Sequence, residues 1–165
     1  MFEPLDEKHG LKVIERLVRA LNETTLRAPL LNETEQRYVA SALVPVVQEV
    51  LSDLKGLTLH GEGLQRAAPA HFLGYHMYPD LAVMHYSQRL VAMEAKYVDF
   101  SLAKGALSTA IGQTVIYARA GYLTSLGILV GVHGRDTRSA IEKENAMLAK
   151  GNATWRLCSP YLTQA

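Results

Sequence analysis

Cysteine is almost absent from this chain, which has a single one, Cys158, among 165 residues. A lone cysteine cannot form an internal disulfide, and no grouping of cysteine and histidine has the spacing of a zinc site. We interpret Cys158 as a small buried apolar residue rather than a nucleophile. The acidic start of the sequence lacks the basic and apolar segments of a secretory signal, which predicts a cytoplasmic protein.

Long hydrophobic runs are also missing, because no apolar stretch approaches the roughly 18 residues that span a bilayer. We therefore expect no membrane partner. A Gly-rich loop ending in Gly-Lys-Ser/Thr is absent as well, which excludes an ATP motor of that type within the chain. The net charge is only +1, so the strong basic excess of many nucleic-acid-binding proteins is lacking. Basic residues outnumber acidic ones only after residue 95, either as a phosphate-facing surface or as scattered solvated side chains.

What the chain does have is an ordinary globular balance, with 48% hydrophobic and 20% charged residues. Its length suits one domain with one core. Hydrophobic periodicity predicts an α/β protein with helical and extended segments in alternation. We expect helices at 5–20, 34–56, 101–121 and 138–150, a loop or hairpin at 61–74, and strands at 57–60, 80–86, 90–98, 126–132 and 154–158. Pro45 should kink or interrupt the second helix.

A charged pair interrupts the apolar run of the strand expected at 90–98. Because side chains alternate along a strand, Glu94 and Lys96 should project from one side, and Met93, Ala95 and Tyr97 from the other. Ionisable groups in a half-buried strand are costly unless they are paired, hydrogen-bonded or bound to metal. Asp80 follows Pro79 at the start of the preceding strand. The plainer alternatives are an ion pair on a solvated strand face and a turn aspartate after proline.

Three short motifs together suggest a family. Pro79-Asp80 and Glu94-Ala95-Lys96 lie on adjacent expected strands, and Gln113 and Tyr117 lie four apart on the helix that follows. In these motifs, over roughly residues 34–132, the chain resembles the PD-(D/E)XK nuclease superfamily, in the branch with a Gln-x-x-x-Tyr signature. It is similar there to the nuclease domain of type I restriction motor subunits. The resemblance implies a central mixed β-sheet flanked by helices, with a restriction-endonuclease-like αβββαβ core.

The resemblance also implies a metal-dependent deoxyribonuclease. Asp80, Glu94 and the backbone carbonyl of Ala95 would bind Mg²⁺, with Mn²⁺ as a substitute, and Lys96 would orient the attacking water and stabilise the transition-state charge. The residue types suit that chemistry, because Mg²⁺ prefers oxygen ligands and needs only one or two carboxylates beside the substrate phosphate.

Three further residues complete the predicted site. Gln113 and Tyr117 would face the metal and hold the substrate or order Lys96, although both also fit a plain helix surface. Glu35 either caps its helix or reaches the metal cluster through a water. Glu33 and Glu49 are the other candidates for this helix glutamate.

By the resemblance, residues 34–132 form the nuclease core of a single domain, with 1–33 as a helical extension and 133–165 as a C-terminal helix and edge strand. The expected partner is DNA, cleaved by a homodimer or by the cutting module of a restriction, repair or defence assembly. The alternatives are an inactive member of this fold that binds DNA or protein, and an unrelated α/β domain. The aromatic and histidine-rich segment 71–78 either lines the DNA channel or forms a partly buried loop.

Overall fold

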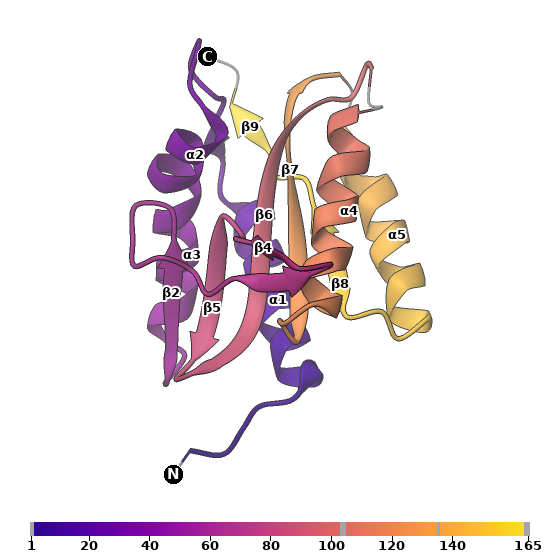
Figure 1. Cartoon of the computed structure of the whole chain (residues 1–165). Coiled ribbons are helices and arrows are strands. Elements are labelled where there is room, and N and C mark those ends of the chain that lie inside the picture. The colour runs from indigo at the N-terminus through magenta and orange to yellow at the C-terminus, as the bar shows by residue number, and fades with distance from the viewer. Residues whose placement is uncertain (1, 103–104, 135, 164–165) are drawn as a thin grey trace.

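A computed structural model of the chain describes residues 2–102, 105–134 and 136–163, and it is an α/β fold built on one mixed sheet. Helices flank this sheet on both faces (Figure 1). The five strands of the sheet, in spatial order, are β2 (Leu57–Gly61), β5 (Leu81–His85), β6 (Gln88–Asp99), β7 (Thr124–His133) and β8 (Trp155–Cys158). The α/β class and the central mixed sheet expected from the sequence are therefore confirmed.

The sheet changes from antiparallel to parallel at its centre. β2, β5 and β6 are antiparallel neighbours, whereas β7 lies parallel to β6 and β8 parallel to β7. Parallel neighbours need long crossover connections, and helices supply them. The crossovers are α4 (Gly105–Arg119) and α5 (Arg138–Lys150).

The two faces of the sheet bury different residues of β6. Val91, Met93 and Ala95 pack in the main core with α1 (Glu7–Glu23) and α3 (Val44–Ser52), as the period of two along a strand requires. Ala92 faces the other way, toward Tyr117 of α4. Glu94 and Lys96 alternate in phase with Ala92, so they belong to the α4 face.

The expected long second helix is broken before Pro45. It consists of α2 (Glu35–Tyr38), a π-helical turn η1 (Val39–Leu43) and then α3, in which Pro45 lies in the first turn. Proline cannot donate a backbone hydrogen bond, and its ring clashes with the carbonyl four residues earlier. A wider π-helical turn relieves this conflict, so the predicted interruption is confirmed.

Two small pairings lie outside the main sheet. β3 (Ala70–Phe72) and β4 (Tyr75–Met77) form a hairpin whose turn residues, Leu73 and Gly74, both have positive φ. Such a turn matches the right-handed twist of paired strands. β1 (Leu26–Arg27) pairs parallel with β9 (Leu162–Thr163), which the sequence analysis did not expect.

Two expected boundaries were wrong. The turn between β5 and β6 is Tyr86-Ser87, with Tyr86 at positive φ, and Gln88 already belongs to β6. The helix expected from residue 101 does not include Ser101 or Leu102, which lie in a turn where the Ser101 backbone N–H and hydroxyl donate to the Asp99 carboxylate, and α4 is described from Gly105 onward. Residues 103 and 104 of the expected helix lie outside the described residues.

The structure also bears on membrane-spanning segments and on Cys158. In the described parts of the chain, no helix is both long and apolar enough to cross a membrane. Cys158 at the end of β8 is 1% exposed, and burial raises the pKa of its thiol to about 12. Its interpretation as a buried apolar residue is therefore confirmed.

Candidate functional site

The site lies along β6 beyond the part that pairs with β5. The first residue of β5, Leu81, lies opposite Met93, whereas β6 continues past Met93 to Asp99. Two carboxylates take the place of a strand beyond that point. Asp80 Oδ2 accepts a hydrogen bond from the backbone N–H of Ala95 at 2.8 Å, and Glu35 Oε2 accepts one from Tyr97 at 2.7 Å. The unpaired edge of β6 thus holds acidic groups from two distant segments.

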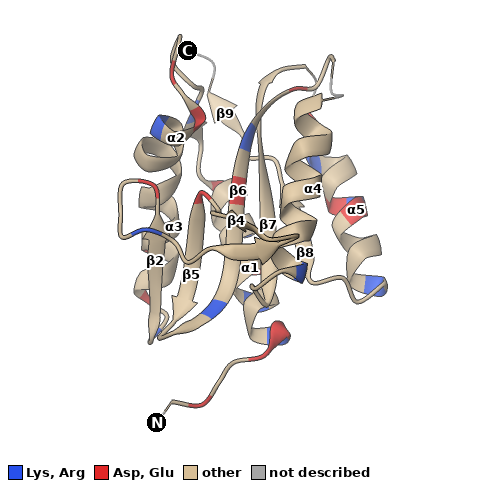
Figure 2. Cartoon of the chain, viewed as in Figure 1, with Lys and Arg blue, Asp and Glu red and all other residues tan. Residues whose placement is uncertain are grey.

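Glu94 and Lys96 add an ion pair to this edge, formed by a buried glutamate and a half-buried lysine. The Lys96 Nζ atom lies 3.3 Å from Glu94 Oε1 and 3.5 Å from Glu35 Oε1, so the ammonium bridges β6 and α2. Figure 2 shows acidic segments side by side on β6 and on the chain that enters β5, with a basic segment further along β6. The predicted same-side placement of Glu94 and Lys96 is confirmed, and the residues predicted from three parts of the sequence meet here.

Glu94 does not lie on a solvated strand face, because it is only 4% exposed. Burial, followed by the nearby charge of Asp80, raises the pKa of Glu94 to about 7. Burial likewise raises the pKa of Asp80 to about 6, against the opposing effects of the Ala95 hydrogen bond and the Lys96 charge. Two carboxylates with raised pKa values are stabilised by any additional cation that enters.

Lys96 remains a cation in this setting. Burial alone would lower the pKa of its ammonium, but the charges of Glu94, Glu35 and Asp80 outweigh it and the net shift is upward. The lysine therefore presents a fixed positive charge at neutral pH.

The helix α4 closes the site from the side. Tyr117 is buried, and burial together with the charges of Glu94 and Asp80 raises the pKa of its phenol. Gln113 lies one turn earlier on the same face of α4, and its buried Oε1 has no hydrogen-bond partner among the described residues. The structure therefore brings Tyr117 to the carboxylates and leaves Gln113 with an unused acceptor beside it in the helix.

The positions of the three candidate helix glutamates, Glu33, Glu35 and Glu49, show which one lies at the site. Only Glu35 reaches the edge of β6. Glu33 instead forms a two-pronged salt bridge with Arg27, and Glu49 is exposed on α3. Thr34, the N-cap of α2, also accepts a hydrogen bond from the Tyr97 hydroxyl at 3.1 Å, which fixes the start of this helix on β6.

Two residues beside the site were missed by sequence reasoning. Gly61 has φ +132°, and a Cβ there would collide with the carbonyl oxygen of Asp80. The next residue, Glu62, donates its backbone N–H to the same carbonyl at 2.9 Å. Together they fix the backbone of Asp80 beside β6. The Gly61 and Gly63 pair was a sequence signal for a tight turn, but it did not indicate which strand the turn would contact.

The donor set suits a hard divalent cation. Glu94 Oε2 is buried and has no partner at hydrogen-bond distance within the described chain, although the Tyr117 phenol lies close enough to interact with this carboxylate, so one carboxylate oxygen can accept a further ligand. The backbone N–H and carbonyl of one strand residue point to the same edge, so the Ala95 carbonyl faces the gap that Asp80 occupies. No group of three or more His, Cys, Asp or Glu side chains suited to a metal occurs among the described residues. Two carboxylates and a carbonyl match Mg²⁺, which keeps several waters, and do not match zinc.

Scans against models of protein families, against curated proteins and against solved structures found no match.

Proposed function

We propose that the protein is a Mg²⁺-dependent DNA nuclease of the PD-(D/E)XK type, with its active site at the unpaired edge of β6. One observation carries the proposal: the half-buried Asp80 and Lys96 meet the buried Glu94, whose Oε2 has no partner at hydrogen-bond distance within the described chain. An ion-pair network that served only stability would be expected to satisfy its buried acceptors. Perturbed carboxylates with an adjacent fixed cation are typical of catalytic sites.

Each residue of the cluster has a distinct task in this proposal. Asp80, Glu94 and the Ala95 carbonyl would hold Mg²⁺, which, when bound, polarises the scissile phosphate and lowers the pKa of a coordinated water. Lys96, kept protonated by its acidic neighbours, stabilises the negative charge that builds on the phosphate oxygens.

The surrounding residues keep this arrangement in place. Glu35 restrains the lysine from α2 through its 3.5 Å contact with Nζ. Tyr117 and the neighbouring turn of α4 restrict water on the Glu94 side, which strengthens the electrostatic interactions within the site.

The test is plasmid nicking with purified protein. Wild type should convert supercoiled DNA to open circles with Mg²⁺ or Mn²⁺ and not with EDTA. Asp80→Asn should lower the rate at least about 100-fold, because it removes one of two charged ligands. The matched control is Asp136→Asn, which alters a surface carboxylate paired with Arg138 and should leave the rate unchanged.

Two results would count against the proposal. Cleavage that persists in EDTA, or that Asp80→Asn leaves intact, would exclude this site as the nuclease centre. DNA binding without hydrolysis under either metal would instead favour an inactive member of the same fold acting as a binding module.

A further inference from the structure

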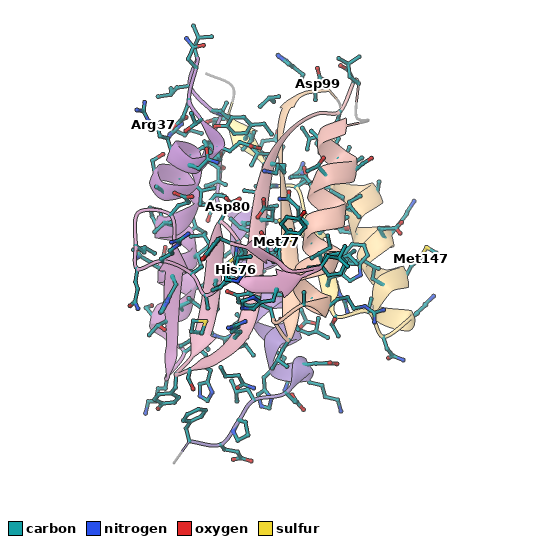
Figure 3. The ribbon with its side chains drawn as sticks, in the orientation of Figure 1. Arg37, His76, Met77, Asp80, Asp99 and Met147 are labelled. Atoms are coloured by element: carbon teal, nitrogen blue, oxygen red, sulfur yellow. The ribbon has the colours of Figure 1, made fainter. Side chains whose placement is uncertain are left out.

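The β3–β4 hairpin leads directly into the candidate site and carries exposed aromatic rings. Phe72, Tyr75 and Tyr78 are all exposed, Tyr75 to 73%. The hairpin crosses in front of β6 on the side of α4, and its residues His76 and Met77 lie below Asp80 in the view of Figure 3. Phe72 and Tyr75 lie opposite each other in the hairpin, and Tyr78 follows its second strand. Exposed rings grouped in this way mark a surface that a partner can cover.

The base of this hairpin is anchored by hydrogen bonds. The backbone N–H of His71 donates to the carbonyl of Ala120 just after α4, and Arg89 of β6 donates to the carbonyl of Pro69 at 2.8 Å. Ala70 is fully buried against the same face of the sheet. The base of the hairpin is therefore fixed to the sheet, while Leu73 and Tyr75 at its tip stay exposed.

A cavity of about 380 Å³ adjoins the hairpin. Arg66 and Tyr78 line it, and the Arg66 guanidinium lies 3.9 Å from the centre of the Tyr78 ring. Pro79, which also lines it, directly precedes Asp80. A volume of this size falls within the range of small-ligand sites and can admit one nucleotide base.

We propose that this surface, made of Phe72, Tyr75, Tyr78 and Arg66, binds an unpaired DNA strand and delivers it to the candidate site. The inference rests on the proposed function for the fate of the strand, but binding itself is independent of cleavage. Unpaired bases expose faces that stack on aromatic rings, whereas the bases of a duplex are already stacked on each other.

The experiment measures fluorescence anisotropy of labelled DNA in EDTA, so that cleavage does not interfere. The probes are an oligothymidylate and a hairpin duplex of equal length in nucleotides. Wild type should bind the unpaired strand at least about tenfold more tightly. Tyr75→Ala and Tyr78→Ala should each weaken that binding about five- to a hundredfold, as expected for the loss of one stacking ring.

The chain offers a matched control in a second Arg–Tyr pair. Arg138, the first residue of α5, lies 4.2 Å from the centre of the Tyr161 ring. Tyr161 is exposed and lies in the segment between β8 and β9, outside the hairpin. Tyr161→Ala should leave binding unchanged, whereas Tyr75→Phe, which keeps the ring, should retain wild-type affinity. Circular dichroism of each variant confirms that the fold is intact.

The outcomes separate this inference from the proposed function. Equal affinity for strand and duplex, or equal losses in Tyr75→Ala and Tyr161→Ala, would overturn the inference and leave nuclease activity untouched. Selective strand binding by a protein that cleaves nothing would support the inference while the proposed function fails.

Discussion

Two acidic clusters meet at the start of α2, because Glu33 belongs to one and Glu35 to the other, and the two clusters behave in opposite ways. Glu33 has both carboxylate oxygens 2.7 Å from the Arg27 guanidinium and a third hydrogen bond from Leu30, so the pKa of Glu33 falls to about 2. Glu94 has one long contact with Lys96 and an unused oxygen, and its pKa rises. The first cluster is satisfied and holds the fold together. The second remains under-neutralised, which suits a cation and a phosphate.

The largest difference between the clusters should be in activity. Lys96→Met removes the cation of the second cluster and should lower DNA cleavage at least about 100-fold. Arg27→Met removes the cation of the first and should leave the cleavage rate almost unchanged. Initial rates of plasmid nicking at saturating Mg²⁺ measure both. Similar losses in the two variants would mean that both clusters act only through stability.

Replacing the glutamate should raise the free energy of unfolding in the second cluster and lower it in the first. Glu94→Gln removes a charge that burial disfavours, so the melting temperature at about pH 8 should rise by about 2–4 °C for each kcal/mol gained. Glu33→Gln breaks a two-pronged salt bridge and should cost about 1 kcal/mol, since the partner arginine is partly solvated. Differential scanning calorimetry without metal measures both. A lower melting temperature in Glu94→Gln would show that its charge is well compensated.

The smallest expected effect is the change of these stability differences with pH. The pKa of Glu94 is raised in the folded state to about 7 from 4.5, so the folded protein binds more protons between these values and its stability falls as pH rises. The gain in Glu94→Gln should therefore shrink as pH falls from about 8 to about 5.

The pH dependence at Glu33 should have the opposite sign. The pKa of Glu33 is lowered from 4.5 to about 2, so its contribution is present above pH 4.5 and is lost as pH falls toward 2. Melting curves across pH measure both trends, and parallel trends in the two glutamine variants would contradict the assigned pKa directions.

The sequence predicted best where a local periodicity decided the structure. The alternation along 90–98 placed Glu94 and Lys96 on one side of β6, and Pro45 predicted the break that became η1. Most positions of strands and helices along the chain followed from the same patterns. These features depend on neighbours in the chain, so the residues themselves carry the information.

What the sequence could not supply depends on where one strand ends relative to another. The backbone N–H groups of Ala95 and Tyr97 can donate to the carboxylates because the pairing of β5 with β6 does not extend beyond Met93. No local pattern in the sequence specifies that register. The choice of Glu35 over Glu33 has the same origin. The turn at Tyr86 was missed because a tyrosine rarely adopts positive φ.

The burial of Cys158 has a practical consequence for following the hairpin in solution. Its thiol is 1% exposed and its pKa is raised to about 12, so thiol-directed dyes have almost no thiolate to attack there. A cysteine introduced at the exposed Leu73 would consequently be labelled alone, without first replacing Cys158. A single fluorophore at that tip would report on strand capture in real time.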